Sequence, residues 1–254
     1  MVNLSRRSAL LGLGGAGALV AATEMGPAFA AGQNGPALEK LSRELAAAPR
    51  RRGFTAVPFM IDQPDLWDHE ASALLLNYGG GPKQLWECSD IGAAWPNLMR
   101  ESLNGQVFAH GHPDFLEISA THGTAHLALF SQVMWDKYGL AAGTRGQFSR
   151  NDLILERPGV SAMDDRQKTD GFYGPGNNNI VSLQRRGVVF VACHDSIHAI
   201  ARGIQAASGA EGPGADVVAA DLTNNLIPGV VLVPSVVAYL VEAQRAGFTY
   251  AKAA

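Results

Sequence analysis

Cysteine is scarce in this chain, which has two cysteines, Cys88 and Cys193, among 254 residues. A small exported fold that depends on disulfides carries more, so the sequence excludes a disulfide-stabilised scaffold. Whether the two cysteines pair stays open, because nothing in the sequence fixes the separation of roughly 4.4–6.8 Å between Cα atoms that a disulfide needs.

Long blocks of positive charge are also lacking. The chain has 20 Lys and Arg, 23 Asp and Glu, and a formal net charge of −3. A mildly acidic chain without a basic block is a poor match for nucleic acid or an anionic membrane surface, so neither is expected as a partner. The serine-hydrolase elbow Gly-x-Ser-x-Gly does not occur in the sequence, which argues against that class of enzyme.

Long apolar runs are absent beyond the N-terminus. There, Arg6-Arg7 is followed by 16 residues without charge (8–23) and by Ala28-Phe29-Ala30, the layout of a twin-arginine export signal. A retained membrane anchor is the weaker alternative, since a spanning helix needs about 20 strongly apolar residues. We predict a signal peptide at 1–30, no stable membrane span after cleavage, and a periplasmic or other extracytoplasmic location.

The last third of the chain has the clearest secondary-structure pattern. A β-branched and aromatic run at 187–193 precedes a helical pattern at 195–203, and a second such pair follows at 230–234 and 236–246. Buried strands that alternate with helices are typical of a parallel sheet covered on both faces, so we predict an open α/β sandwich. Other predicted elements are helices at 37–48, at 122–138 and from 180, strands at 71–78, 106–109 and 151–157, and a surface loop at 161–179.

This region also carries several motifs in a fixed order. They are Gly187-Val188-Val189-Phe190-Val191-Ala192-Cys193, Leu226-Ile227-Pro228-Gly229-Val230, Val233-Pro234-Ser235 and Gln244-Arg245-Ala246-Gly247-Phe248-Thr249-Tyr250. Over 180–252 the sequence resembles the DsrE/DsrF-like family. The resemblance implies a flavodoxin-like three-layer sandwich with a mostly parallel sheet, assembly as a homo-oligomer, and kinship with sulfur-relay proteins. It divides the chain into the signal at 1–30, an N-terminal extension at 31–70 and a DsrE/F-like domain with insertions at 71–254.

Cys193 is the first candidate site residue. It ends a predicted parallel strand and precedes a helix start, where ligand sites of open α/β sheets lie and where a thiolate is favoured. The family commonly has its persulfide-carrying cysteine at this position. His194 and Asp195 follow as candidate catalytic partners: a protonated His194 would favour the thiolate, and Asp195 either orients a histidine or caps the helix. The alternative for Cys193 is a small buried apolar residue.

Six of the seven histidines fall in three pairs, His110/His112, His122/His126 and His194/His198. The last two pairs have the i, i+4 spacing that places two imidazoles on one face of a helix. His122, His126 and His198, together with Cys193, are therefore candidate ligands of a transition metal such as Zn or Cu. Paired histidines without a fixed zinc motif also occur as caps or surface groups.

Three functional hypotheses follow from these residues. The first is an exported DsrE/F-like protein that handles a small sulfur species, or exchanges electrons with a redox partner protein, through Cys193. The second is a periplasmic metal- or cofactor-binding protein that uses the paired histidines. The third is a non-catalytic oligomeric domain in which the cysteine is only buried. The sequence does not decide whether the protein is an enzyme.

Overall fold

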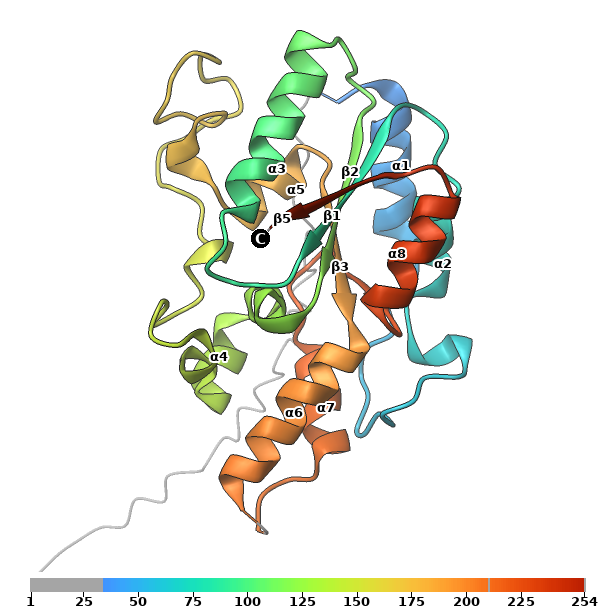
Figure 1. Ribbon diagram of the computed structural model, residues 1–254, viewed down its shortest axis with the longest axis vertical. Helices are drawn as coiled ribbons and strands as arrows, with labels where there is room; N and C mark the ends of the chain where they lie inside the picture. Colours follow the sequence, from blue (N-terminus) through green and yellow to red (C-terminus); the bar gives the residue numbers. More distant parts are fainter. Residues whose placement is uncertain (1–33, 210, 254) are drawn as a thin grey trace, which may run out of the picture.

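The computed structural model describes residues 34–209 and 211–253 (Figure 1), so the predicted signal peptide at 1–30 lies outside the described residues. Strands alternate with helices over most of this length. The elements are α1 (Pro36–Ala47), η1 (Pro64–Leu66), α2 (His69–Leu76), β1 (Lys83–Cys88), α3 (Trp95–Asn104), η2 (Gly105–Ala109), β2 (Leu116–Thr121), η3 (Gly123–Leu129), α4 (Gln132–Tyr138), η4 (Leu140–Thr144), η5 (Asp152–Ile154), η6 (Pro175–Asn177), α5 (Ile180–Arg185), β3 (Val189–Cys193), α6 (His194–Ser208), α7 (Ala215–Asn224), β4 (Val231–Val233), α8 (Val236–Arg245) and β5 (Thr249–Ala253).

The described strands form one five-stranded sheet in the order β4-β3-β2-β1-β5, and every neighbouring pair is parallel. The chain crosses the sheet from β1 to β4 and then returns to place β5 on the other side of β1. Helices cover both faces, with α1, α2 and α8 on one side and α3 on the other (Figure 1). The predicted α/β class and the three-layer sandwich are confirmed.

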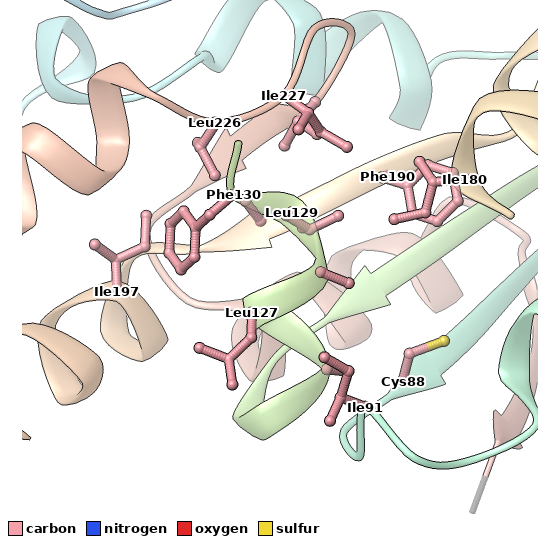
Figure 2. Close-up of a cluster of buried hydrophobic side chains, with 14 of the residues drawn as sticks. Cys88, Ile91, Leu127, Leu129, Phe130, Ile180, Phe190, Ile197, Leu226 and Ile227 are labelled. Carbon is pink, nitrogen blue, oxygen red and sulfur yellow. The ribbon is translucent and has the colours of Figure 1, made fainter. Parts of the chain in front are cut away.

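Two buried apolar clusters fill the space between the sheet and its helices. The first, called here the α8-side core, joins α1, α2 and α8 to alternate strand residues such as Leu85, Ala120 and Val191. The second, the α3-side core, packs the opposite strand residues against the remaining helices. Figure 2 shows part of it, with Phe130 near Ile197 and Leu226. The alternation of strand side chains between the two cores is what the pleat of a buried sheet requires.

The predicted elements of the last third are confirmed. β3, α6, β4 and α8 lie within a few residues of the predicted bounds, and α1 and α5 also begin as predicted. β1, β2 and β5 were not predicted. β1 contains half-buried Lys83, Gln84 and Glu87, and β2 contains a fully buried Glu117, so neither has the apolar run used to recognise strands.

Four predicted elements are wrong. The predicted strand 71–78 is the helix α2, because its Ala and Leu residues are good helix formers and none is β-branched. The predicted strand 106–109 is the π-helical turn η2, and most of 151–157 is the short 3-10 turn η5 and irregular chain. The predicted helix 122–138 is two helices, η3 and α4, separated by Phe130 in an isolated bridge to Leu226.

The segment before β1 is joined closely to the sheet. Asp114 accepts hydrogen bonds from the amides of Ala37 and Leu38 and so caps α1 from a distant loop. Asp68 lies beside the edge strand β4: its amide donates to the Leu232 carbonyl at 3.1 Å, and its carboxylate accepts from the Leu232 amide at 2.8 Å. Asp68 thereby satisfies the N–H and the C=O of Leu232, which would otherwise be unpaired on this edge strand.

Candidate functional site

The carboxyl ends of the strands lie at one edge of the sheet, and Cys193 is the last residue of the interior strand β3. Its sulfur belongs to the α8-side core and its side chain is buried, with the residue 3% exposed. The amide of Val236, the first residue of α8, donates a hydrogen bond to Sγ at 3.4 Å. The positive end of a helix thus faces the sulfur, as it does at many reactive cysteines.

The helix at the sulfur is not the one that the sequence suggested. α6 begins directly after Cys193, but Cys193 makes no side-chain bond to that helix. The sulfur turns instead toward α8, which follows β4. The second cysteine, Cys88, is buried on the α3 side of the sheet, where burial raises the pKa of its thiol to about 12. Both cysteines are free.

His194 and Asp195 do not accompany the sulfur. The ring of His194 is buried and its Nε2 donates to the Pro58 carbonyl at 2.8 Å, toward the loop before α2. Burial lowers the pKa of His194, which opposes the protonated form expected from the sequence. Asp195 is exposed in the first turn of α6. The three candidate catalytic residues are consecutive in the chain, but the two buried side chains point to different surroundings.

The candidate metal ligands are also spread out. His198 donates from Nε2 to the Val57 carbonyl at 3.1 Å, and its ring meets that of His194 edge to face, with centroids 4.8 Å apart. His126 is fully buried, neither of its nitrogens has a partner among the described residues, and burial lowers its pKa to about 3. His122 precedes η3 in an extended conformation, so the i, i+4 spacing to His126 does not place the two rings on one helix face. Within 34–209 and 211–253, no group of three or more His, Cys, Asp or Glu side chains is arranged to hold a metal ion.

His122 instead belongs to a cluster that the sequence did not indicate. Its Nε2 lies 3.0 Å from a carboxylate oxygen of Glu87 on β1, and the hydroxyl of Tyr250 on β5 donates to the other oxygen of Glu87. The side chains of Glu87 and His122 are 15% and 21% exposed, so solvent reaches both. The sequence signal for Glu87 was its position next to Cys88. That position would have placed Glu87 at the carboxyl end of a strand if β1 had been predicted.

The hydrogen bonds of this cluster set the protonation of Glu87. Burial by itself would raise the pKa of this carboxyl, but the bonds from Tyr250 and His122, with the charge of Lys252, outweigh burial and lower the pKa. The bond to Glu87 raises the pKa of Tyr250 to about 12. Glu87 is therefore an ionised acceptor at neutral pH, between two donors.

A turn at Gly123 allows His122 to remain extended beyond β2. Gly123 has φ +56°, and a Cβ at this position would lie 2.5 Å from the Ser89 carbonyl oxygen. Both the left-handed backbone and the close approach exclude other residues without a local rearrangement. The turn also contacts α6, because the Gly123 amide donates a hydrogen bond to the Ser196 hydroxyl at 3.3 Å.

Beside this turn lies a cavity of about 520 Å³ between η3, η4 and α6. Small and aliphatic residues make up most of its lining, which includes Gly123, Thr124, Leu127, Ser196, Ile200 and Gly203. Its size and its apolar walls are those of a pocket for a small organic molecule.

Comparisons with known proteins add no assignment. No family model matches the chain, and a search of curated proteins gave no match. In the described part of the chain, no helix has the length and apolar character needed to cross a membrane.

Proposed function

We propose that this protein is an exported DsrE/F-like protein that handles a small sulfur or redox species through Cys193. The observation that carries the proposal is the hydrogen bond from the Val236 amide to the Cys193 sulfur, at the carboxyl end of an interior parallel strand. The proposed extracytoplasmic location continues to depend on Arg6-Arg7 and the sequence that follows them.

The chemistry proposed for Cys193 is sulfur transfer. A Cys193 thiolate attacks the outer sulfur of a small persulfide, R–S–SH, and forms a new S–S bond as the S–S bond of the persulfide breaks. The products are the Cys193 persulfide and the thiolate R–S⁻, so no external oxidant is consumed. Because Cys193 is 3% exposed, a compact sulfur species suits this site better than a bulky one.

Mass spectrometry of the intact protein tests this proposal. The Cys88→Ser variant, with Cys193 as its one cysteine, is incubated with inorganic polysulfide at neutral pH. We expect a mass gain of one sulfur atom, reversed by a reducing agent and absent when Cys193 is also changed to Ser. No mass gain, or an equal gain without Cys193, would contradict sulfur handling and favour the third hypothesis, a buried structural cysteine.

A second candidate function, binding of an organic cofactor or ligand, is supported by the cavity beside α6. It differs from the metal-binding hypothesis because the cavity walls are apolar and supply few ligating groups. Retention of a small molecule by the protein after native export, detected by mass spectrometry under non-denaturing conditions, supports this candidate. Its loss on filling the cavity would locate the molecule.

A further inference from the structure

Three neighbouring strands each bring one polar side chain to the carboxyl edge of the sheet: Cys193 from β3, His122 directly after β2 and Glu87 from β1. Tyr250, near the start of β5 and paired with Leu85, reaches Glu87 from the next strand. Contacts already described join His122, Glu87 and Tyr250. What remains is the relation between His122 and Cys193, which follows from the register of the sheet.

The register places His122 beside Cys193. β2 and β3 are paired in parallel up to Thr121 and Ala192. The next residue on each strand is still extended, with φ −146° and ψ −171° for His122 and φ −97° and ψ 115° for Cys193. Extending the pairing by one residue makes these two residues neighbours across a strand spacing of about 4.8 Å.

Side-chain alternation places the row on one face. Cys193 lies in the α8-side core, as does Ala120, which precedes His122 by two residues on an extended chain. Leu85 lies in the same core and precedes Glu87 by two residues on β1. Residues two apart on a strand point to the same side. His122 is therefore between Cys193 and Glu87, on the face that α8 covers.

We propose that His122 is the base that removes the thiol proton of Cys193, with Glu87 and Tyr250 as the residues that position it. This inference rests on the function proposed above, and it adds the groups that activate the sulfur. The proton leaves Sγ of Cys193 and is taken up by Nδ1 of His122, which leaves a thiolate beside an imidazolium. The positive ring is then stabilised by the Glu87 carboxylate.

The tautomer of His122 is fixed by Glu87. An ionised carboxylate only accepts hydrogen bonds, so Nε2 of His122 must carry the hydrogen of the 3.0 Å contact. In the neutral ring, Nδ1 then holds the lone pair, and within the described residues it has no hydrogen-bond partner. Of the two ring nitrogens, Nδ1 is thus the one able to accept a proton, as expected of a general base that a further group, here Glu87, orients.

Tyr250 holds the carboxylate. Its hydroxyl donates to the second oxygen of Glu87 from the edge strand β5, and the side chain is partly open to solvent. The remaining titratable groups near the sulfur are Tyr239 of α8, in the same core, and His194 and Asp195 at the start of α6. Tyr239 and His194 are both uncharged at neutral pH, since burial raises the pKa of the phenol and lowers that of the imidazole. His122 is thus the neighbour suited to take the proton.

The protonation state of Cys193 is measured without any reagent that must enter the core. In the Cys88→Ser background, the S–H stretching band of the Raman spectrum reports Cys193 alone and is followed from pH 4 to pH 10. We expect His122→Gln to raise the apparent pKa of the thiol by about 1–3, which lowers the thiolate fraction at neutral pH by about tenfold or more. Glu87→Gln shifts the titration in the same direction by less, and Tyr250→Phe by less again. His110→Gln, a change at an exposed histidine at the opposite end of β2, leaves it unchanged.

An unchanged S–H titration in folded His122→Gln overturns the inference. If that variant does not fold, judged by circular dichroism, the titrations of Glu87→Gln and Tyr250→Phe decide, and no shift in either overturns it. Polysulfide loading distinguishes failure of His122 as the base from failure of the function proposed for Cys193. Loading that persists with the same pH profile in His122→Gln removes His122 as the base but leaves sulfur handling by Cys193. Failure to load the parent protein at a pH where the S–H band is absent removes the proposed function.

Discussion

Replacing His126 by methionine tests whether this residue is a buried neutral imidazole or a metal ligand. The side chains are similar in size, and the change removes two nitrogens that have no partner in the described part of the chain. Leaving a buried polar group unpaired costs about 1–3 kcal/mol. At neutral pH we therefore expect His126→Met to be as stable as the parent protein or more stable.

The pH dependence gives the sharper test. Burial lowers the pKa of His126 from 6.5 to about 3, so at mildly acidic pH the unfolded chain binds a proton that the folded protein excludes. The stability contributed by the neutral ring is complete above pH 6.5 and is lost progressively as the pH falls toward 3. With these two pKa values, the loss between pH 7 and pH 5 is about 2 kcal/mol. His194 and His198, whose pKa values are also lowered, contribute to both proteins and largely cancel in the comparison.

The assay is urea unfolding of the parent, His126→Met and His110→Met at pH 7 and pH 5. The exposed His110 is the control, and its replacement should leave the pH dependence of the free energy of unfolding unchanged. We expect the loss of stability on acidification to be about 2 kcal/mol smaller in His126→Met than in the parent. Equal losses within about 0.5 kcal/mol would refute the buried neutral imidazole. A zinc-dependent rise of the melting temperature in the parent but not in the variant would show that His126 is a ligand after all.

Two further predictions concern other parts of the molecule. Asp68→Ala should lower the free energy of unfolding by about 3–5 kcal/mol, because the change leaves the Arg52 guanidinium and the Leu232 amide without their buried acceptor. Asp65→Ala, at a side chain that is 92% exposed, is the control and should change this free energy little. Equal effects of the two changes in urea unfolding would contradict the role of Asp68 in pairing the edge strand β4. Gly203→Leu should fill the cavity beside α6, because a Cβ at this position meets no atom within 4 Å. The change should therefore reduce the binding of an apolar fluorescent dye. Gln205→Leu, at an exposed position of α6 outside that cavity, is the matched control, and equal dye binding by the two variants would show that the dye binds elsewhere.

β3 and β4 were predictable because they are continuous apolar runs bounded by turn residues. β3 is buried along its whole length and contains no polar side chain before Cys193. β1 and β2 lack this pattern for a physical reason. Glu117 can be buried in β2 because the indole of Trp86 donates to it at 2.6 Å, and a partner 31 residues away is invisible to any local reading of the sequence.

The site was predicted in part. That Cys193 ends a buried strand and precedes a helix was correct, since both properties are local. The helix that faces the sulfur was not predicted, because α8 reaches Cys193 only through the pairing of β3 with β4. The metal set assumed that His122 and His126 share a helix. The extended backbone at His122 and the turn at Gly123 separate them, and the histidine spacing alone contains no sign of either.

The row of polar residues from Cys193 to Tyr250 illustrates how a parallel sheet brings together residues that are distant in the sequence. Glu87 and Tyr250 are 163 positions apart and share a hydrogen bond because β1 and β5 are neighbours. Along each strand only every second residue faces α8, so a shift of one residue in the β2–β3 register would place His122 out of step with Cys193. The His122 side chain meets Glu87 on the face where Cys193 is buried only when both registers hold together. For this reason the pairing of strands, more than the spacing of histidines in the chain, decides which imidazole lies next to Cys193 in the sheet.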